Sequence, residues 1–374
     1  MLGAGGWIAL FLSGFIDSAP NRLAHASAQM LWQAPRPARL ATLVALALTT
    51  ITAFIPPARL RAYAALLGGI ALFSASLYAA GLYAAALSSP AAPAARQSLG
   101  LAAWTQFAVA LFVVMQARSD ARIGWIARIT APLLLVAALL VAALSGWLDK
   151  LSLAQEFSAQ RASFMAELLR HLMLVGASLF FALLVGVPLT LLSLRKASYR
   201  AAIFASLNIL QTIPSIAIFG LLIAPLSMLA EHAPLLRRLG ISGTGATPAI
   251  IALTLYALLP LVRNFATGIA EVPVDVKDAA RGLGFDRKYL FLRVELPLAL
   301  PALIAGLRVV TVQSIGLATV AALIGAGGLG TFVFDGIGQY APDLVLVGTF
   351  PVILLALAAD RAFRLAQSAI ERPA

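Results

Sequence analysis

The sequence predicts an all-α, polytopic membrane protein with about ten transmembrane helices. Over 374 residues, 61% are hydrophobic and 11% are charged, whereas an ordinary soluble domain has roughly 45–50% apolar and about 25% charged residues. Uncharged apolar segments recur along the chain, and a spanning helix needs about 20 apolar residues. This composition excludes a water-soluble globular enzyme. The uncharged apolar segments are 40–55, 62–87, 98–116, 129–148, 172–194, 201–230, 239–262, 309–334 and 344–359.

A shorter apolar stretch, Gly6–Phe15, supplies the first predicted span. Small residues at 24–28 would also suit the cleavage site of a signal peptide, which is the alternative. A signal peptide begins with a positively charged region, and no Lys or Arg precedes Arg22. The missing charge favours a span that starts in the cytoplasm.

The basic residues indicate the orientation of the chain in the bilayer. With the N-terminus in the cytoplasm, most of the 27 Lys and Arg residues fall on cytoplasmic loops, as the positive-inside rule requires. The formal charge of +12 therefore reflects topology. No Lys/Arg block alternates with stacking aromatic residues, so a nucleic-acid partner is not expected.

Residues that could carry out chemistry are scarce. The chain has no cysteine, which excludes disulfides, thiolate metal sites and cysteine nucleophiles. His25, His171 and His232 are scattered at predicted span ends or in outer segments, so we expect surface or interfacial histidines and neither a catalytic nor a metal site. Arg308 is the one ionisable residue well within a predicted span. For it we favour a structural role, by snorkelling or bonding to neighbouring carbonyls, over a gate.

A polar segment divides the chain into two regions. Residues 149–170 are rich in Gln, Ser, Glu and Arg and separate about five spans in 1–148 from a second region, 171–374. We expect this segment to be an outer connector, either an amphipathic helix or a loop. Small residues abound in the first region, for example at 79–87, and allow helices to pack closely in lipid.

The longest cytoplasmic loop, 270–297, is patterned as two short helices with a break. Val274–Arg281 is compatible with a helix, and Gly284 allows the backbone to leave it. Asp286 is placed to cap a second helix, which we expect to end before the Leu-Pro pair at Pro297. A structured cytoplasmic hairpin on a membrane protein indicates that another protein docks on it.

This loop resembles the signature of ATP-binding-cassette (ABC) importer permeases, E-A-A-x-x-x-G followed after nine residues by I-x-L-P. The chain has D-A-A at 278–280, a glycine at 284, and V-E-L-P at 294–297 after nine residues; Asp replaces Glu and Val replaces Ile. The resemblance implies that the loop is the coupling helix, which docks on a cytoplasmic ATPase and transmits its closure. The residues so assigned to ATPase coupling are Asp278, Ala279, Ala280, Gly284, Leu296 and Pro297.

The residue types of this motif suit that role. Two alanines would give a flat face that another protein can approach, and the glycine would supply a turn where a side chain would clash. The alternative is a solvated amphipathic loop with no partner.

Three further stretches resemble permeases that import osmoprotectants such as glycine betaine, choline and carnitine. They lie at 208–215, 256–264 and 321–330, and the resemblance covers about 165–366. It implies a core like that of a type I ABC importer permease, with five N-terminal spans similar in layout to the long form of this branch. Methionine-importer permeases share the glycine-rich segment, so another small solute such as methionine is the alternative cargo.

The glycine-rich segment also fits a nucleotide-binding pattern. Gly325, Gly327 and Gly330 satisfy G-x-G-x-x-G, which elsewhere binds a dinucleotide pyrophosphate at a strand-to-helix turn. Here no strand is predicted before the motif, so a Rossmann unit is not expected. We expect a close backbone crossing or bend at the outer end of the ninth span, with 332–340 as a re-entrant segment.

Polar residues interrupt two predicted spans. Polar groups at bilayer depth face a cavity or another helix. They are therefore candidates for the translocation path, with hydrogen bonding between helices as an equal alternative. No aromatic cage for a quaternary ammonium can be assembled from these spans. The candidate path residues are Gln211, Thr212, Pro214, Ser215 and Gln313.

The resemblance implies the rest of the assembly. No G-x-x-x-x-G-K-[ST] phosphate loop occurs in the chain, so the chain is not itself the ATPase and no cofactor is expected in it. The family implies ATPase subunits that bind ATP and Mg, a second permease subunit, identical or homologous, and a periplasmic or extracytoplasmic substrate-binding protein, at the bacterial cytoplasmic (inner) membrane.

Two other classes compete with this interpretation. Gradient-driven secondary transporters usually place carboxylates at mid-membrane, but here Asp and Glu are confined to loops and predicted span ends. A membrane-embedded enzyme would need convergent His, Asp or Glu near one leaflet, which the sequence does not show.

Overall fold

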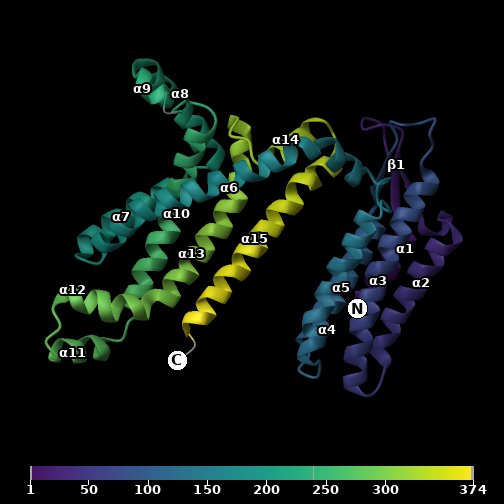
Figure 1. Cartoon of the computed structure of the whole chain (residues 1–374), viewed down its shortest axis with the longest axis horizontal. Coiled ribbons are helices and arrows are strands. Elements are labelled where there is room, and N and C mark those ends of the chain that lie inside the picture. Colours follow the sequence, from purple (N-terminus) through teal and green to yellow (C-terminus); the bar gives the residue numbers. More distant parts are fainter. Residues whose placement is uncertain (1, 239, 372–374) are drawn as a thin grey trace. The chain divides into compact units, whose positions relative to one another are not determined.

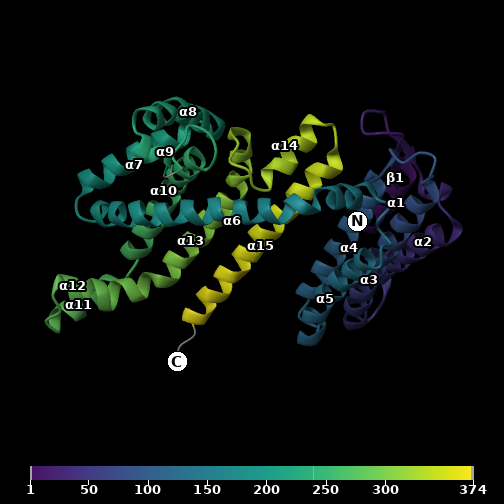
Figure 2. The same cartoon turned by 45° about the horizontal axis from the view of Figure 1, so that its top comes forward.

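The computed structural model describes residues 2–238 and 240–371, which form two compact units (Figures 1 and 2). The first unit contains the residues up to Ala159 together with Gln339–Asp343, and the second contains the remainder. The boundary at Ala159 lies within the polar segment 149–170. Among the described residues, nine helices are long and apolar enough to cross a membrane.

The first unit consists of helices and a small antiparallel sheet. Strand β1 (Ile16–Ala19) lies between β2 (Ser27–Gln29) and β3 (Arg96–Leu99). No sequence pattern predicted this sheet, because its strands are too short to show alternation. The helical elements are α1 (Leu2–Leu12), η1 (Leu31–Gln33), α2 (Arg36–Ile51), η2 (Thr52–Phe54), α3 (Ala58–Leu87), α4 (Leu101–Ser119), α5 (Trp125–Leu144) and the start of α6 (Ser152–Ser193).

The first predicted span, Gly6–Phe15, is where the structure departs from ten spans. Helix α1 has 11 residues, so at about 1.5 Å per residue it is much shorter than the roughly 30 Å hydrocarbon core of a bilayer. The chain leaves the helix at Leu12, and Phe15 and Ile16, both fully buried, enter the sheet region. The described residues therefore contain nine helices of spanning length.

Small residues bring α3 close to its neighbours. A Cβ at Gly69 would lie 2.7 Å from Val114 Cγ2 of α4. On the other side, Thr49 of α2 donates a hydrogen bond to the Gly68 carbonyl at 2.9 Å. Close packing through small residues, which the composition predicted, is therefore present in this unit.

The second unit is arranged around α10, which contacts α7, α8 and α13. Leu253, Leu261 and Val262 of α10 are almost fully buried. After α6, the elements of this unit are α7 (Ala197–Thr212), α8 (Ser215–His232), α9 (Pro234–Arg238), α10 (Ala246–Ala270), α11 (Val274–Gly282), α12 (Arg287–Leu290), the π-helical turn η3 (Phe291–Glu295), α13 (Leu296–Ala318), η4 (Val320–Ile324), α14 (Gly330–Gly338) and α15 (Pro342–Glu371).

The polar connector forms the first part of a long helix. Helix α6 runs for 42 residues without a break, about 60 Å at the α-helical rise. This length exceeds the hydrocarbon core by a wide margin. The polar residues up to 170 therefore extend one continuous helix beyond its apolar part.

The glycine-rich segment is a bend. Gly325, Gly327 and Gly328 adopt positive φ angles of 75°, 74° and 87°, and a Cβ at Gly330 would collide with the Thr319 carbonyl oxygen. The short helix α14 follows, and the chain turns into α15. Residues 296–324 before the bend are helical, so the strand that a dinucleotide site requires is missing at this place.

One face of α6 holds this bend, and it includes a buried histidine that was predicted to lie at the surface. His171 is fully buried, and its Nε2 lies 3.1 Å from the Ile315 carbonyl oxygen of α13. One turn earlier, Glu167 accepts a hydrogen bond from the Gly328 N–H at 2.5 Å. Glu167, Arg170 and His171 are three and four residues apart and therefore lie on one helical face. This spacing was the sequence signal that could have predicted their grouping.

Arg308 has a carboxylate partner. Its Nε lies 3.7 Å from Asp360 Oδ1 of α15, and Arg364 contacts the other oxygen of Asp360 at 2.7 Å. The partner is a carboxylate where we expected carbonyl groups, and the preference for a structural role over a gate stays a prediction.

Candidate functional site

The hairpin that was predicted to be cytoplasmic begins with α11 and turns at Gly284. Gly284 N–H donates to the Arg281 carbonyl at 2.9 Å, and Phe285 N–H donates to the Ala280 carbonyl at 3.2 Å. These two bonds form a Schellman motif. Gly284 adopts φ of +84°, and nothing lies within 4 Å of the position of a Cβ. The turn therefore needs glycine for its backbone conformation, and the steric clash that we expected is not the reason.

The second helix of the hairpin is capped as predicted but does not end where predicted. The Asp286 side chain accepts a hydrogen bond from Tyr289 N–H at 2.6 Å. The helix then continues through the π-helical turn η3 into α13, with Pro297 in the first turn of α13. A wider turn accommodates the proline, which cannot donate a backbone hydrogen bond. The expected end before Leu296 and Pro297 is therefore wrong.

The two alanines of the motif have different environments. Ala279 is exposed, whereas Ala280 is 6% exposed. The idea of a flat face made by both alanines is therefore wrong, because Ala280 packs inside the hairpin. The exposed side of α11 instead carries Asp275, Asp278 and Ala279, which recur at the three- and four-residue spacing of one helical face.

One ion pair joins the two arms of the hairpin, and two further side-chain contacts lie within the turn and within α11. Lys277 Nζ lies 3.8 Å from Glu295 Oε1, which joins α11 to η3. The rings of Phe285 and Tyr289 meet edge to face with centroids 4.8 Å apart. Asp278 pairs with Arg281 at 2.6 Å. The hairpin is thus a cross-linked element that can transmit a displacement to α13, with which it is continuous.

Four of the five candidate path residues, Gln211, Thr212, Pro214 and Ser215, lie at the break between α7 and α8. The carbonyl of Ile213 points out of the helix at this break, because the residue before a proline is pushed out of the helical conformation. Tyr256 of α10 donates its hydroxyl to this carbonyl, and Gln211 Nε2 donates to the Tyr256 carbonyl at 2.7 Å. Gln211 therefore joins α7 to α10, as the helix-bonding alternative predicted.

The other path residues have separate environments. Thr212 bonds to the Ile209 carbonyl of its own helix at 2.7 Å. Pro214 is exposed and Ser215 half-buried at the start of α8. Gln313 lies half-buried on α13. Tyr256, which donates a hydrogen bond at the break, was missed as a site residue because only the packing of α10 brings its hydroxyl to the Ile213 carbonyl.

The architecture of the second unit matches a family of known proteins. The model of the family described as "Binding-protein-dependent transport system inner membrane component" matches residues 178–372, just over half of the chain. The chain belongs to this family. It is an ABC importer permease, a multi-pass membrane subunit without catalytic activity. A second model, described as "ABC transporter permease YehY, N-terminal domain", matches residues 1–154.

Curated relatives cover about half of this permease. It is 37% identical over 205 residues to the osmoprotectant import permease protein OsmW of Salmonella typhimurium, covering 54% of the chain and 90% of OsmW. It is also 37% identical over 190 residues to the glycine betaine/carnitine/choline transport system permease protein OpuCB of Bacillus subtilis, covering 51% of the chain and 80% of OpuCB.

A solved structure shares the fold of the permease. The inward-facing MetNI methionine ABC transporter aligns with a TM-score of 0.50 at 22% identity, covering 56% of this chain and 96% of the matched chain. At this identity the likeness concerns the fold alone.

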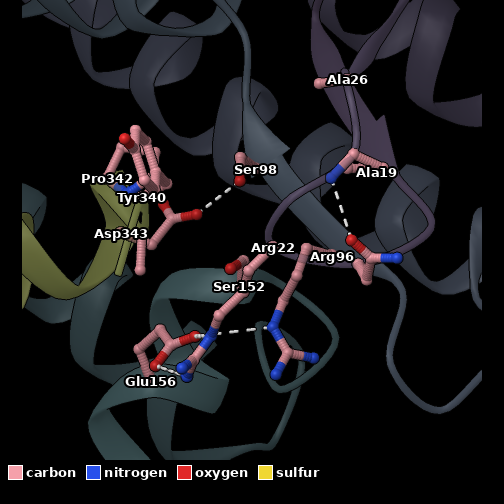
Figure 3. A pocket seen from close by; sticks show the side chains of 13 residues that line it. Ala19, Arg22, Ala26, Arg96, Ser98, Ser152, Glu156, Tyr340, Pro342 and Asp343 are labelled. Carbon is pink, nitrogen blue, oxygen red and sulfur yellow. Dashed lines mark hydrogen bonds and ion pairs between the residues drawn. The ribbon is translucent and has the colours of Figure 1, made fainter. Parts of the chain in front are cut away.

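A polar pocket of about 170 Å³ lies in the first unit, at the predicted outer side of the permease (Figure 3). Glu156 in the first turns of α6 is 2% exposed. Arg22 Nε and Nη2 contact its two carboxylate oxygens at 3.0 and 2.5 Å, and Arg96 Nε lies 3.5 Å away. Two guanidinium groups therefore neutralise one buried carboxylate.

The same pocket fixes the segment Gln339–Asp343, which joins α14 to α15 along the chain. Ser98 donates a hydrogen bond to Asp343, which is 6% exposed. Arg22 Nη1 donates to Gln339 Oε1 at 3.0 Å. These partners are up to 317 residues apart in the chain, so no local pattern could have predicted the pocket.

Asp17 on β1 carries a carboxyl group near this pocket. Burial, and secondly the neighbouring carboxylate of Asp343, raise the pKa of Asp17 above its usual value. The folded permease therefore holds a proton on Asp17 more strongly than the unfolded chain does, so stability falls as the pH rises through this raised pKa.

We predict that Asp17→Asn raises the thermal unfolding temperature of the purified permease at pH 7, because it removes the ionised carboxylate and its repulsion with Asp343. The gain should disappear below about pH 4, where Asp is protonated in both states. Exposed Asp149, changed to Asn, is the control and should not shift the midpoint. A lower midpoint for Asp17→Asn at pH 7 would contradict the raised pKa.

We predict that Glu156→Gln destabilises the first unit, because it leaves Arg22 and Arg96 without their shared carboxylate. Breaking a buried pair typically costs 3–5 kcal/mol, and partial exposure of both guanidinium groups places the expected loss at about 3 kcal/mol or below. Urea titration of detergent-solubilised permease measures the loss, with Asp149→Asn as the control. Equal stability of the variant and the wild type would show that the cluster contributes nothing.

Proposed function

We propose that this permease forms the membrane path of an ATP-driven importer for osmoprotectants, with glycine betaine as the leading cargo. The observation that carries this proposal is 37% identity to osmoprotectant permeases over about half of the chain. The three stretches that resemble that branch also shape the second unit. Residues 208–215 contain the break between α7 and α8, and 256–264 contain Tyr256, which hydrogen-bonds to the Ile213 carbonyl at this break. Residues 321–330 form the glycine-rich bend.

The electrostatics of the second unit support a cargo without net charge. The candidate path residues Gln211, Ser215 and Gln313 are polar and uncharged. Arg308 on α13 is paired with Asp360, and Arg263 on α10 is exposed and donates a hydrogen bond to Asn208 Oδ1 at 3.2 Å. An unpaired charge in a pore would hold or repel ions, whereas a zwitterion such as glycine betaine has no net charge. Neutral polar groups therefore suit its passage.

The proposed energy source is a separate cytoplasmic ATPase that binds ATP and Mg and docks on α11. The exposed face with Asp275, Asp278 and Ala279 offers two carboxylates and a small apolar side chain. The buried residue Ala280 and the turn at Gly284 set the shape of the hairpin, and Leu296 and Pro297 connect it to α13. Closure of the ATPase would then reach the membrane through one continuous helix.

The proposed complex also contains a second permease subunit, identical or homologous, and a periplasmic or extracytoplasmic substrate-binding protein. The description of the matched family as binding-protein-dependent supports the latter. A quaternary ammonium is best held by a cage of aromatic rings. The sequence predicts no such cage in the spans of this chain. Selection of the cargo is therefore assigned to the binding protein.

We predict saturable uptake of labelled glycine betaine, and of choline or carnitine to a lesser extent, in cells that lack other osmolyte importers and express the complete system. The same cells without this permease are the control. Uptake of methionine without uptake of any betaine-like solute would overturn the cargo, while leaving the permease assignment in place.

We predict that Ala279→Glu reduces uptake at least tenfold and weakens co-purification of the ATPase, while membrane abundance stays normal. A third carboxylate on the docking face would be buried against the partner without a counter-charge. Gly284→Val should act similarly, because a β-branched residue resists a positive φ.

The control for this experiment is Ala121→Glu, an exposed position on the loop between α4 and α5. It adds the same charge away from the hairpin and should leave uptake unchanged. Near-normal uptake in both Ala279→Glu and Gly284→Val would show that α11 is not the coupling element.

A further inference from the structure

A cavity of about 1050 Å³ lies behind the coupling hairpin in the second unit. It is bounded by the end of α6, the end of α10, the helix α11 and the segment from α12 to η3. One wall is apolar and includes Leu194, Ile269 and Phe291. In the predicted topology these helix ends lie where the cytoplasmic face of the bilayer meets water.

The rest of the lining is strongly basic. Five cationic side chains and one carboxylate, that of Glu295, line the cavity. Glu295 forms an ion pair with Lys277 (Oε1 to Nζ, 3.8 Å). Arg281 forms an ion pair with Asp278 (Nη1 to Oδ1, 2.6 Å). The five cationic residues are Arg195, Lys196, Lys277, Arg281 and Arg287.

Three of these cations have no carboxylate partner among the residues that the structure describes. Arg195, Lys196 and Arg287 form no ion pair within this part of the chain, and the ammonium group of Lys196 lies 5.6 Å from the centre of the Tyr199 ring. Three unpaired cations around one cavity repel one another. An anionic group placed between them would relieve this repulsion.

The cavity and the docking face lie on different sides of α11. Lys277 and Arg281 line the cavity and are four residues apart on one helical face. Asp275 and Ala279, which are also four residues apart, are exposed and do not line it. Asp278 of the docking face pairs with Arg281 of the cavity lining, so the two surfaces adjoin at this pair. Arg195, Lys196 and Arg287 lie outside α11, and an ATPase that contacts Asp275 and Ala279 would leave these three cations free for a different ligand.

We infer that the cavity binds the headgroup of an anionic phospholipid of the cytoplasmic leaflet. The phosphate would lie among Arg195, Lys196 and Arg287, because guanidinium and ammonium groups bind phosphate well, and the start of the acyl chains would lie against the apolar wall. A free phosphate ion would bind the basic side chains but has no apolar part that could pack against the apolar wall. Basic pockets at the cytoplasmic ends of spans are typical sites for such lipids.

The bound lipid would connect the end of α6 to the coupling hairpin. Arg195 and Lys196 follow α6, whereas Arg287 begins α12, and one phosphate contacted by all three would hold these segments at a fixed separation. This inference rests on the cytoplasmic placement of the hairpin in the proposed function. It does not depend on the identity of the cargo.

The test measures lipid retention on the purified full-length permease by native mass spectrometry. The cavity variant is R195Q/K196Q/R287Q. The control variant, R59Q/R61Q/R361Q, removes the same charge from exposed residues that do not line the cavity. Each protein is titrated with phosphatidylglycerol and, separately, with phosphatidylcholine, and each phosphatidylglycerol titration is repeated with millimolar inorganic phosphate.

We expect the wild type and the control variant to retain phosphatidylglycerol at least tenfold better than phosphatidylcholine, and the cavity variant to lose this preference. Equal retention by the cavity and control variants would overturn the inference. Displacement of phosphatidylglycerol by inorganic phosphate would show a small-anion site instead. Loss of the lipid on addition of the co-purified ATPase would show that the cavity is part of a protein interface, which would also overturn the inference.

Because retention is measured without transport, the result is independent of the uptake experiments. A permease that imports betaine but shows no lipid preference would refute the lipid site alone. A permease that binds phosphatidylglycerol in the cavity but imports another solute would refute the cargo alone.

Discussion

The requirement that every backbone polar group find a partner away from water governs this permease. In a bilayer an unpaired N–H or C=O group costs several kcal/mol, so helices are the default, and each departure from a helix needs a replacement hydrogen bond. The break between α7 and α8 frees the Ile213 carbonyl, and the Tyr256 hydroxyl binds it. The glycine-rich bend frees the Gly328 N–H, and the Glu167 carboxylate accepts its hydrogen bond. The irregular segments are therefore tied to specific side chains of neighbouring helices.

The same constraint explains where the charged residues lie. Arg308 shares Asp360 with Arg364, and Glu156 is held between Arg22 and Arg96. An isolated charge at these places would be expensive, so each charge is part of a pair or a triad. The cavity behind α11 is different, because three of its cations are exposed, so that water can solvate them, and lack such a partner among the described residues. Their grouping beside an apolar wall favours an anionic group with an apolar part. This difference is the reason for assigning an external anion to it.

The hairpin formed by α11 and α12 combines a rigid interior with an exposed face. The Schellman turn at Gly284, the Asp286 cap and the Lys277–Glu295 pair fix the relation between α11 and α12. The π-helical turn then continues the second arm into α13 without a loop. A hairpin that continues into a membrane helix has no flexible loop between its second arm and that helix. A displacement of α11 would therefore be passed on to α13 with little loss.

The sequence by itself determined the fold class and the hairpin turn, because these depend on local patterns: apolar runs, and the Gly284 and Asp286 signals at fixed spacing. The orientation in the bilayer stays a prediction from the basic loops. The sequence also indicated the break at Pro214 and the bend at Gly325, since proline and glycine restrict or free the backbone wherever they occur. The tertiary structure decided which polar groups meet. The burial of His171, the bond from Tyr256 to Ile213, and the joining of Arg22 to Glu156 depend on residues distant in the chain. Such pairs leave no periodic signal, because their proximity is created only when the helices pack.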